Sequence, residues 1–539
     1  MTTDDLQELG ILRTKLSQAR ALLELNARVD DLIEGCLQER QSLADALGHV
    51  LPALCQAVGG RGAFLRSFSE DLALTTFVHP LDLSRADMDE ALKRTEVGGG
   101  PCVLHSEGQV IVAQPLDVGG EWFGHAGVIL PANSPYFSDH EHVAEALNVV
   151  CEEVDNFLYA IRATRERHRV MMDLGDALRH RVLSEGLRAA VTVLAKAVPL
   201  ERLLLVCVAE EQSSRSVHVQ LFNGGALEVD TMSEGPAARD DVALRDMARS
   251  YLVDGDIALL GHLGFANVQE EVLINGVTVT NIVGKIVATS TVGAFNTYDR
   301  ELLAGFAGFI RQRIVDFNKE WRTLARSFCS EDVARLLSFG DYTARYLAPR
   351  EEEVGILFTD IAGFTMLSEQ VLRSPSAVAT LVEAWSRRAV DLVWKHGGVF
   401  DKMVGDCVIA LFGPPFFDMP SSERIASAIA CARDIRAMTT ALPDELDLAG
   451  LRDAGLAVST GVHLAPLFVG QFGPNDNFTG FSSGMNNTAR LQGCAGRDEI
   501  LVMREATQKL KPDHDFRFGP VREAKVKNVA EALQFVALI

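Results

Sequence analysis

The stretch VGILFTDIAGFT, residues 354–365, strongly constrains the fold because it places a charge at the end of an apolar run. The run VGILF has the composition of a strand buried inside a sheet, and Asp360 follows it closely. A carboxylate at the mouth of a core strand costs free energy unless a metal ion, a basic group or solvent meets it. Gly363 then bends the chain and Thr365 starts a helix. The stretch predicts a strand, a turn and a helix around a carboxylate that has a partner.

The residues after this stretch predict the rest of one mixed domain. Apolar residues at helical spacing fill 376–396, after a helix break at Ser374-Pro375. The segment VFDKMVGDCVIALFG, residues 399–413, has the pattern of two short strands around a tight VGD turn. A further helix and strand-like text at 455–473 follow. This order predicts an antiparallel-rich sheet with helices on one side, a ferredoxin-like palm.

The length and composition indicate a globular protein of several domains. A chain of 539 residues is too long for one core, so three domains or so are expected. Hydrophobic residues make up 47% of the chain and charged residues 23%, as in folded proteins. The net charge of −22 argues against nucleic acid as a partner, because phosphate contact needs clustered Lys and Arg.

The same composition bears on the compartment. No stretch approaches the roughly 18 uninterrupted apolar residues of a membrane span. The acidic start lacks the plan of a signal peptide. Nine cysteines scattered singly favour reduced thiols over disulfides or a zinc site. We therefore expect a cytoplasmic protein without a membrane span.

Two segments in the first three fifths of the chain share one plan, at about 33–160 and 180–312. Each begins with an amphipathic helix, continues into strand-like text and a late hairpin, and closes with a helix after a short turn. This plan predicts an α+β sensor-like domain in each segment. The order resembles the GAF family of small-molecule-sensing domains, and the resemblance implies a small-molecule ligand as a partner of these domains.

Two local patterns bear on that ligand. Phe295 to Asp299 resembles part of a cyclic-nucleotide signature of the GAF family, although Arg300 stands where an acid is expected. The alternative is an ordinary helix cap. Cys102 and His105 in PCVLH resemble a bilin attachment site, and the alternative is a structural role for both.

A heptad pattern ends the second segment. It consists of apolar residues at alternating steps of four and three: Ile310, Ile314, Phe317, Trp321, Leu324 and Phe328. With charged residues on the other face, such a seam predicts a helix that pairs with a copy of itself. The alternative is a helix packed on its own domain. Two further stretches repeat the theme more weakly: Leu9, Leu12, Leu16, Ala19 and Leu23, and then Leu147, Val150, Val154, Leu158 and Ile161.

Asp360 and Asp406 are the candidate metal ligands of the last domain. Asp360 ends a strand and Asp406 lies in the hairpin turn, so both are expected at one edge of one sheet. No Cys or His ligand accompanies them, and an oxygen-only site suits Mg²⁺ or Mn²⁺. The turn from Ile361 to Thr365 presents backbone N–H groups at a helix start, a favourable place for phosphate oxygens. The alternative is two solvated turn aspartates.

Three motifs in this part of the chain are similar to those of class III nucleotidyl cyclases: FTDIAGFT, GGVFDKMVGDCVIALFG and FTGFSSGMNNTARL. The resemblance covers roughly 350–539, about a third of the chain. It implies that two Mg²⁺ or Mn²⁺ ions bridge the carboxylates and a triphosphate while the ribose 3′-hydroxyl attacks the α-phosphorus. It also implies a head-to-tail homodimer with its sites at the interface.

The resemblance assigns a role to each matching position. Metal ligands would be Asp360, Asp406 and the Ile361 carbonyl, and phosphate would lie against Gly363, Phe364 and Thr365. From the other subunit, Lys402 and Ser483 would contact the base, Asn486 would orient the ribose, Arg490 would stabilise charge at the α-phosphate, and Lys527 would bind the triphosphate. Two departures stand out, because Ser483 replaces a commoner Asp or Thr and Asn528 replaces the usual Gly after Lys527.

Lys402 stands where adenylate cyclases place a base-reading lysine, so ATP is the expected substrate. We expect a metal-dependent adenylate cyclase that forms 3′,5′-cyclic AMP and pyrophosphate under the control of GAF-like domains. A guanylate or other nucleotidyl cyclase, and a non-catalytic homologue that binds a nucleotide, are the alternatives. The expected domains are an N-terminal helix at 1–32, GAF-like domains at 33–165 and 175–312, a coiled-coil helix and linker at 306–345, and the catalytic domain at 346–539.

Overall fold

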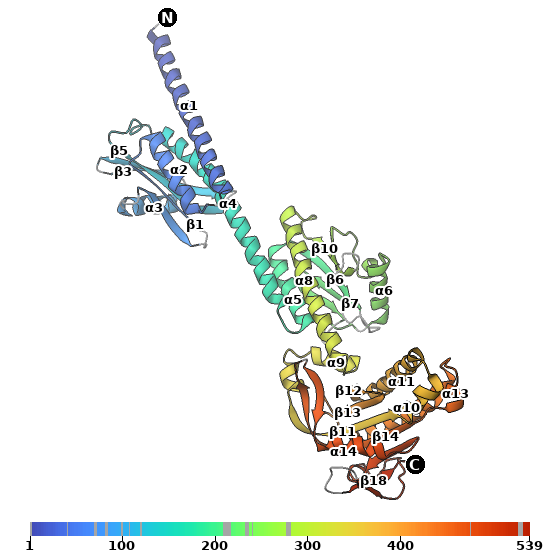
Figure 1. Ribbon diagram of the computed structural model, residues 1–539. Helices are drawn as coiled ribbons and strands as arrows, with labels where there is room; N and C mark the ends of the chain where they lie inside the picture. Colours follow the sequence, from blue (N-terminus) through green and yellow to red (C-terminus); the bar gives the residue numbers. More distant parts are fainter. Residues whose placement is uncertain are drawn as a thin grey trace. The chain divides into compact units, whose positions relative to one another are not determined.

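The computed structural model describes residues 3–39, 41–68, 73–80, 83, 85–98, 101–106, 108–118, 121–208, 217–231, 237–239, 241–275, 282–474, 476–525 and 532–539. The chain divides into two units, Met1–Arg169 and Val170–Ile539 (Figure 1). Within the described ranges, no helix is long and apolar enough to cross a membrane.

The first unit is a five-stranded antiparallel sheet with helices on both faces. The strand order is β2-β1-β5-β4-β3. One face packs on α1, α2 and α4, and the other carries the short helix α3 (Figure 1). The elements are α1 (Thr3–Gln38), α2 (Leu43–Val58), β1 (Gly62–Phe68), β2 (Leu74–His79), α3 (Arg85–Gly98), β3 (Cys102–Ser106), β4 (Gln109–Val118), β5 (Glu121–Pro131) and α4 (His140–Leu178).

The second unit begins with another five-stranded antiparallel sheet, in the order β8-β7-β6-β10-β9. Helices α5 and α8 cover one face, and α6 and α7 cover the other. The elements are α5 (Leu183–Ala197), β6 (Leu200–Val208), β7 (Val217–Asn223), β8 (Ala226–Asp230), α6 (Val242–Val253), α7 (Ala258–His262), β9 (Glu270–Asn275), β10 (Ile282–Ser290) and α8 (Thr297–Leu324).

The two sheets share a connectivity. In the first sheet, β1 lies between β2 and β5, and β4 lies on the other side of β5. In the second sheet, β6 lies between β7 and β10, and β9 lies on the other side of β10. This agrees with the repeated plan of the sequence, while the likeness to GAF domains stays a prediction. The start of α8 bears on the pattern from Phe295 to Asp299, because Asn296 and Asp299 form a reciprocal capping box. The helix-cap alternative therefore accounts for Asp299.

The heptad seam of α8 does not face a second copy. All six seam residues, from Ile310 to Phe328, are at most 7% exposed. They belong to one core cluster that also holds the inward side chains of α5, β6 and β10. The prediction that this helix pairs with its own copy through these residues is therefore wrong, and the helix packs on its own domain. The periodicity marked the apolar face correctly but not its partner.

The last part of the second unit is one large sheet. The strand order is β12-β13-β11-β14-β16-β18-β17, with β15 paired to β14. The lead-in is α9 (Ser330–Leu337) and the π-helical turn η1 (Thr343–Leu347). The strands are β11 (Arg350–Ile361), β12 (Gly398–Val404), β13 (Cys407–Phe412), β14 (Val458–Phe472), β15 (Asn477–Phe481), β16 (Glu499–Met503), β17 (Arg522–Ala524) and β18 (Leu533–Ala537). The helices are α10 (Phe364–Met366), η2 (Leu367–Leu372), α11 (Pro375–Lys395), α12 (Ser421–Ala441), η3 (Leu442–Asp444), α13 (Leu451–Ala454), α14 (Ser483–Cys494) and α15 (Arg504–Thr507).

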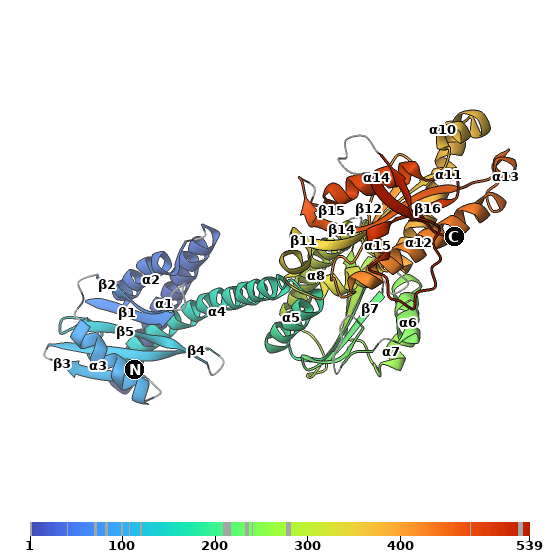
Figure 2. The same ribbon diagram turned by 90° about the horizontal axis from the view of Figure 1, so that it is seen from below.

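Helices cover both faces of this sheet. Helices α11 and α12 pack on one face, where the buried Trp385 indole donates a hydrogen bond to Thr439 Oγ1 at 2.9 Å. Helix α14 lies against β14 on the opposite face (Figure 2). The α+β class and the antiparallel-rich sheet are confirmed, but the expectation that helices lie on one side only is wrong.

Candidate active site

The two predicted carboxylates meet where three strands end. Asp360 is the last residue but one of β11, which pairs with β13 on one side and β14 on the other. Val404 pairs with Cys407, so Gly405 and Asp406 form a two-residue turn between β12 and β13. Gly405 has a φ of 64°, a conformation that favours glycine and fits a tight hairpin. The VGD turn predicted from the sequence is confirmed.

The charges of this pair are only partly compensated. Burial, and then the neighbouring Asp406, raise the pKa of Asp360 to about 7. Asp360 Oδ1 and Asp406 Oδ2 are buried and have no hydrogen-bond partner within the described ranges. Burial and the same two carboxylates raise the pKa of Cys407 to about 12. The edge of the sheet is therefore a partly buried place of strong negative potential.

A divalent cation fits this donor set. The orphaned oxygens of Asp360 and Asp406 are hard ligands of the kind that Mg²⁺ and Mn²⁺ take. Among the residues that the structure describes, no group of three or more His, Cys, Asp or Glu side chains gathers to hold a metal. An ion here would complete its shell with carbonyl, water or phosphate oxygens, and the residue after Asp360, Ile361, is buried.

The strand–turn–helix unit forms as predicted, with an irregular helix. Gly363 has a φ of 74°, and the chain then enters α10. This helix is only three residues long and continues as the π-helical η2, which ends at Leu372. Phe364 is half-buried and Thr365 is exposed. The next helix, α11, starts with Ser374 as its N-cap and proline at its first position, where a missing N–H costs nothing.

Lys402 lies beside a second buried carboxylate that the sequence did not single out. Its Nζ donates a hydrogen bond to Thr479 Oγ1 on β15 at 3.1 Å and lies 3.6 Å from Asp401 Oδ2. The Asp401 side chain is 1% exposed, and burial raises its pKa. The pairing register slips between Phe400 and Lys402, so Asp401 occupies a β-bulge. Bulges re-aim side chains beside functional sites.

Helix α14 carries the predicted Asn486 and Arg490, four residues apart. Asn486 is exposed and Arg490 is half-buried. Within the described residues, no hydrogen bond or ion pair joins either side chain to Asp360 or Asp406. The helix begins with Ser482, whose side chain accepts from Gly484 N, and Ser483 follows as an exposed first residue.

The approach of α14 to the sheet depends on a glycine. A Cβ at Gly461 of β14 would lie 2.6 Å from Gln492 N and 2.8 Å from Thr488 O. Gln492 Nε2 also donates to Ser459 Oγ at 2.7 Å, which fixes the helix over the strand. Lys527, the predicted triphosphate ligand, lies outside the described residues.

Comparisons with known proteins agree on this part of the chain. Residues 347–538 match the family model described as the adenylate and guanylate cyclase catalytic domain. Adenylate cyclase 2 of Rhizobium meliloti (strain 1021) is 27% identical over 208 residues, which are 36% of this chain and 52% of that protein. Photoactivated adenylate cyclase subunit alpha of Euglena gracilis is 33% identical over 146 residues, 26% of this chain and 13% of that protein.

Solved structures of two cyclases also match. The adenylyl cyclase CyaB from P. aeruginosa is 24% identical, with a TM-score of 0.32, over 36% of this chain and 96% of that chain. The guanylyl cyclase Cya2 is 20% identical, with a TM-score of 0.30, over 35% of this chain and 93% of that chain. The matched region thus spans about half of the Rhizobium relative and a smaller part of the Euglena relative. Residues 347–538 belong to the adenylate and guanylate cyclase catalytic domain family.

Proposed function

We propose that this protein converts ATP to 3′,5′-cyclic AMP and pyrophosphate, with two Mg²⁺ or Mn²⁺ ions in each site. The observation that carries the proposal is the half-buried pair of Asp360 and Asp406, with a buried oxygen on each side chain that has no hydrogen-bond partner within the described residues. These carboxylates and the Ile361 carbonyl would hold the ions. When bound, such ions activate a hydroxyl nucleophile and neutralise a leaving pyrophosphate.

The chain's own groups would bind and orient the triphosphate. Backbone groups from Gly363 to Thr365 would lie against phosphate oxygens. Asn486 would hold the ribose so that O3′ faces the α-phosphorus, and Arg490 would stabilise the charge that develops there. The bond from O3′ to the α-phosphorus forms, the bond to pyrophosphate breaks, and the hydroxyl proton leaves to solvent. Lys527 would hold the triphosphate.

The base would be read by the group around Lys402. The ammonium is already placed by Thr479 and by the buried carboxylate of Asp401. A lysine donates to the ring nitrogens of adenine but cannot accept from the N1–H and amino group of guanine, as a carboxylate would, which favours ATP. Ser483 has a hydroxyl that accepts or donates, so it sets a weaker preference than a carboxylate would.

The complete site would require two copies of the chain. Asp360 and Asp406 would come from one copy, and the set on β12 and α14 from the other. The exposed leucines of α1 support pairing, since Leu9, Leu12, Leu16 and Leu23 follow heptad spacing and are 42–72% exposed. We propose that two copies of the chain pair through α1, and not through the buried seam of α8.

The two sheets of the N-terminal regions would act as sensors. We propose GAF-like domains at 33–165 and 175–312, joined to a catalytic domain at 346–539. Their shared strand connectivity supports one ancestry and one kind of role. In this scheme a small molecule bound by these regions alters turnover through α8.

The test is turnover by the purified full chain with Mn²⁺ and each of the four nucleoside triphosphates in turn. Cyclic AMP and pyrophosphate in equal amounts are expected with ATP. Asp360→Ala should abolish product, whereas Asp391→Ala, an exposed aspartate of α11, should leave turnover unchanged. Cyclic GMP as the main product would assign a guanylate cyclase. No turnover with any triphosphate would leave a nucleotide-binding homologue.

A further inference from the structure

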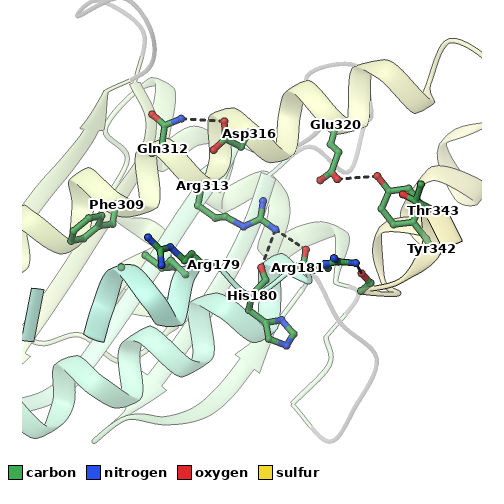
Figure 3. A pocket seen from close by; sticks show the side chains of 13 residues that line it. Arg179, His180, Arg181, Phe309, Gln312, Arg313, Asp316, Glu320, Tyr342 and Thr343 are labelled. Atoms are coloured by element: carbon green, nitrogen blue, oxygen red, sulfur yellow. Dashed lines mark hydrogen bonds between the residues drawn. The ribbon is translucent and has the colours of Figure 1, made fainter. Parts of the chain in front are cut away.

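A cavity of about 660 Å³ lies where the second sheet region meets the lead-in to the catalytic domain. Three segments line it: the end of α4 with its following turn, the middle of α8, and the entry to η1 (Figure 3). Its volume falls within the range of small-molecule sites, roughly 300–1,000 Å³. The cavity is distinct from the carboxylate pair and from the strands that hold Lys402.

Three arginines gather at this cavity. Arg179 and Arg181 come from the end of α4 and its turn, and Arg313 comes from α8 (Figure 3). Arg313 Nη2 donates to His180 O at 3.3 Å and Arg181 O at 2.7 Å, and Arg181 Nη1 donates to Gly340 O at 3.0 Å. These acceptors are neutral carbonyls.

The positive charge of the cavity is therefore only partly compensated. Within the described ranges, Arg181 and Arg313 form no ion pair with a carboxylate at 4.0 Å or closer, whereas Arg179 pairs with Asp176 at 2.9 Å. The two acids of the lining have other partners. Asp316 accepts from Gln312 Nε2 at 3.1 Å, and Glu320 accepts from the Tyr342 hydroxyl at 2.9 Å.

The remaining donors suit an anion. A guanidinium has five N–H donors in a planar fork, and Arg313 and Arg181 each use only one nitrogen for the contacts above. This fork matches the paired oxygens of phosphate and carboxylate groups. The half-buried rings of Phe309 and Tyr342 supply apolar surface at the same cavity. Burial lowers the pKa of Arg313, and the nearby Glu320 and Asp316 carboxylates offset this only in part.

We propose that this cavity binds a small organic anion, with its phosphate or carboxylate group on Arg179, Arg181 and Arg313 and its apolar part near Phe309. The bound anion also acts on the catalytic domain. Arg181 holds Gly340, and Glu320 holds Tyr342, so the cavity joins α8 to the segment that leads into β11. The effect on turnover rests on the proposed function, whereas binding does not.

The test measures binding to the full-length protein by titration calorimetry with three probes. Phenyl phosphate and benzoate share a ring and differ in the anion, and benzyl alcohol is a neutral analogue. Binding of either anion, with none of benzyl alcohol, is expected, and the better anion identifies the ligand class. Equal binding of benzyl alcohol, or no binding by either anion, would overturn the proposal.

Variants then locate the site. Arg179→Gln removes a guanidinium that is 79% exposed on its side chain and should weaken anion binding roughly tenfold without unfolding the chain. Arg313→Gln should weaken it at least as much. Arg300→Gln is the matched control, since this arginine lies on the same helix as Arg313 and pairs with Glu270 outside the cavity. Unchanged affinity in Arg179→Gln and Arg313→Gln would refute the assignment even if turnover is never detected.

Discussion

Replacing Asp360 by Asn should stabilise the metal-free protein while it abolishes turnover. Asp360 is half-buried next to Asp406, and burial together with that neighbour raises its pKa from 3.8 to about 7. The folded protein therefore keeps a proton on this carboxyl at a pH where the unfolded chain has lost it. At neutral pH, folding brings two carboxylates together without a cation, and this lowers the free energy of unfolding.

The pH dependence fixes the sign and size of the effect. The cost of this carboxyl is absent below pH 3.8, grows as the pH rises towards 7, and is complete above 7. A shift of about three units corresponds to about 4 kcal/mol at 1.36 kcal/mol per unit, an upper bound because solvent screens a partly exposed pair. At pH 5 the same relation gives about 1.7 kcal/mol. Asparagine does not titrate, so the gain from Asp360→Asn should be larger at pH 8 than at pH 5.

Urea unfolding in EDTA at pH 8 and pH 5, followed by tryptophan fluorescence, measures this difference. Trp385 reports on the domain, because it is buried in α11. Addition of Mn²⁺ should then stabilise the wild-type protein more than Asp360→Asn. Asp391→Asn, on the exposed face of α11, should change neither midpoint. A lower midpoint for Asp360→Asn at pH 8, or an equal change at both pH values, would refute the view that the two carboxylates repel each other.

Three further substitutions test the surroundings of the site. Asp401→Asn removes the charge 3.6 Å from the Lys402 ammonium, so steady-state kinetics should show a KM for ATP raised about three- to tenfold, as for a loss of roughly 1 kcal/mol, with little change in kcat. Gly461→Ala forces a methyl against the backbone of α14, and urea unfolding should show a loss of about 1–3 kcal/mol together with reduced turnover. Phe328→Ala empties a buried site against Phe478, so the free energy of unfolding should fall by about 3–5 kcal/mol. Each expectation can fail: Asp401→Asn could leave the KM unchanged, Gly461→Ala could keep the native unfolding midpoint, and Phe328→Ala could lose less than about 1 kcal/mol. Each of these results would contradict the contacts described above.

Most strands, turns and helix starts near the carboxylate pair could be predicted from short stretches of sequence. The buried strand before Asp360 reads as an apolar run, and the VGD turn contains a glycine where the backbone requires a positive φ. The start of α11 has both a serine cap and a proline at its first position. Each of these features depends on residues next to one another in the chain, which is the range over which sequence patterns are informative.

The heptad seam of α8 failed for a different reason. A 3.6-residue period reports which face of a helix is apolar, but it does not report what covers that face. The seam from Ile310 to Phe328 is covered by α5 and the second sheet, which come from earlier parts of the sequence, and at its end by Phe478 of β15, which comes from a later part. By contrast, the weaker pattern in α1 lies on an exposed face, where Leu16 is 72% exposed.

Asp401 and Thr479 were missed because their importance arises from long-range pairing. The contact between Lys402 and Thr479 joins residues 77 positions apart, and only the approach of β12 to β15 brings them together. A bulge between Phe400 and Lys402 changes the alternation of side chains, so a period-2 reading of β12 assigns its faces incorrectly. The buried aspartate next to the lysine was the one available signal, since a carboxylate in a strand calls for a partner.

The end of α8 is attached to the same two strands. Ser327 O, three residues after α8, accepts hydrogen bonds from Phe400 N on β12 at 2.9 Å and from Trp394 Nε1 at 3.1 Å. The next residue, Phe328, packs edge-on against Phe478 of β15, with ring centroids 5.0 Å apart. A displacement of α8 would therefore reach β12 and β15 directly. Because Lys402 and Thr479 lie one or two residues further along these strands, a signal carried by α8 should change the surroundings of Lys402, the proposed base-reading residue, before it changes the carboxylate pair.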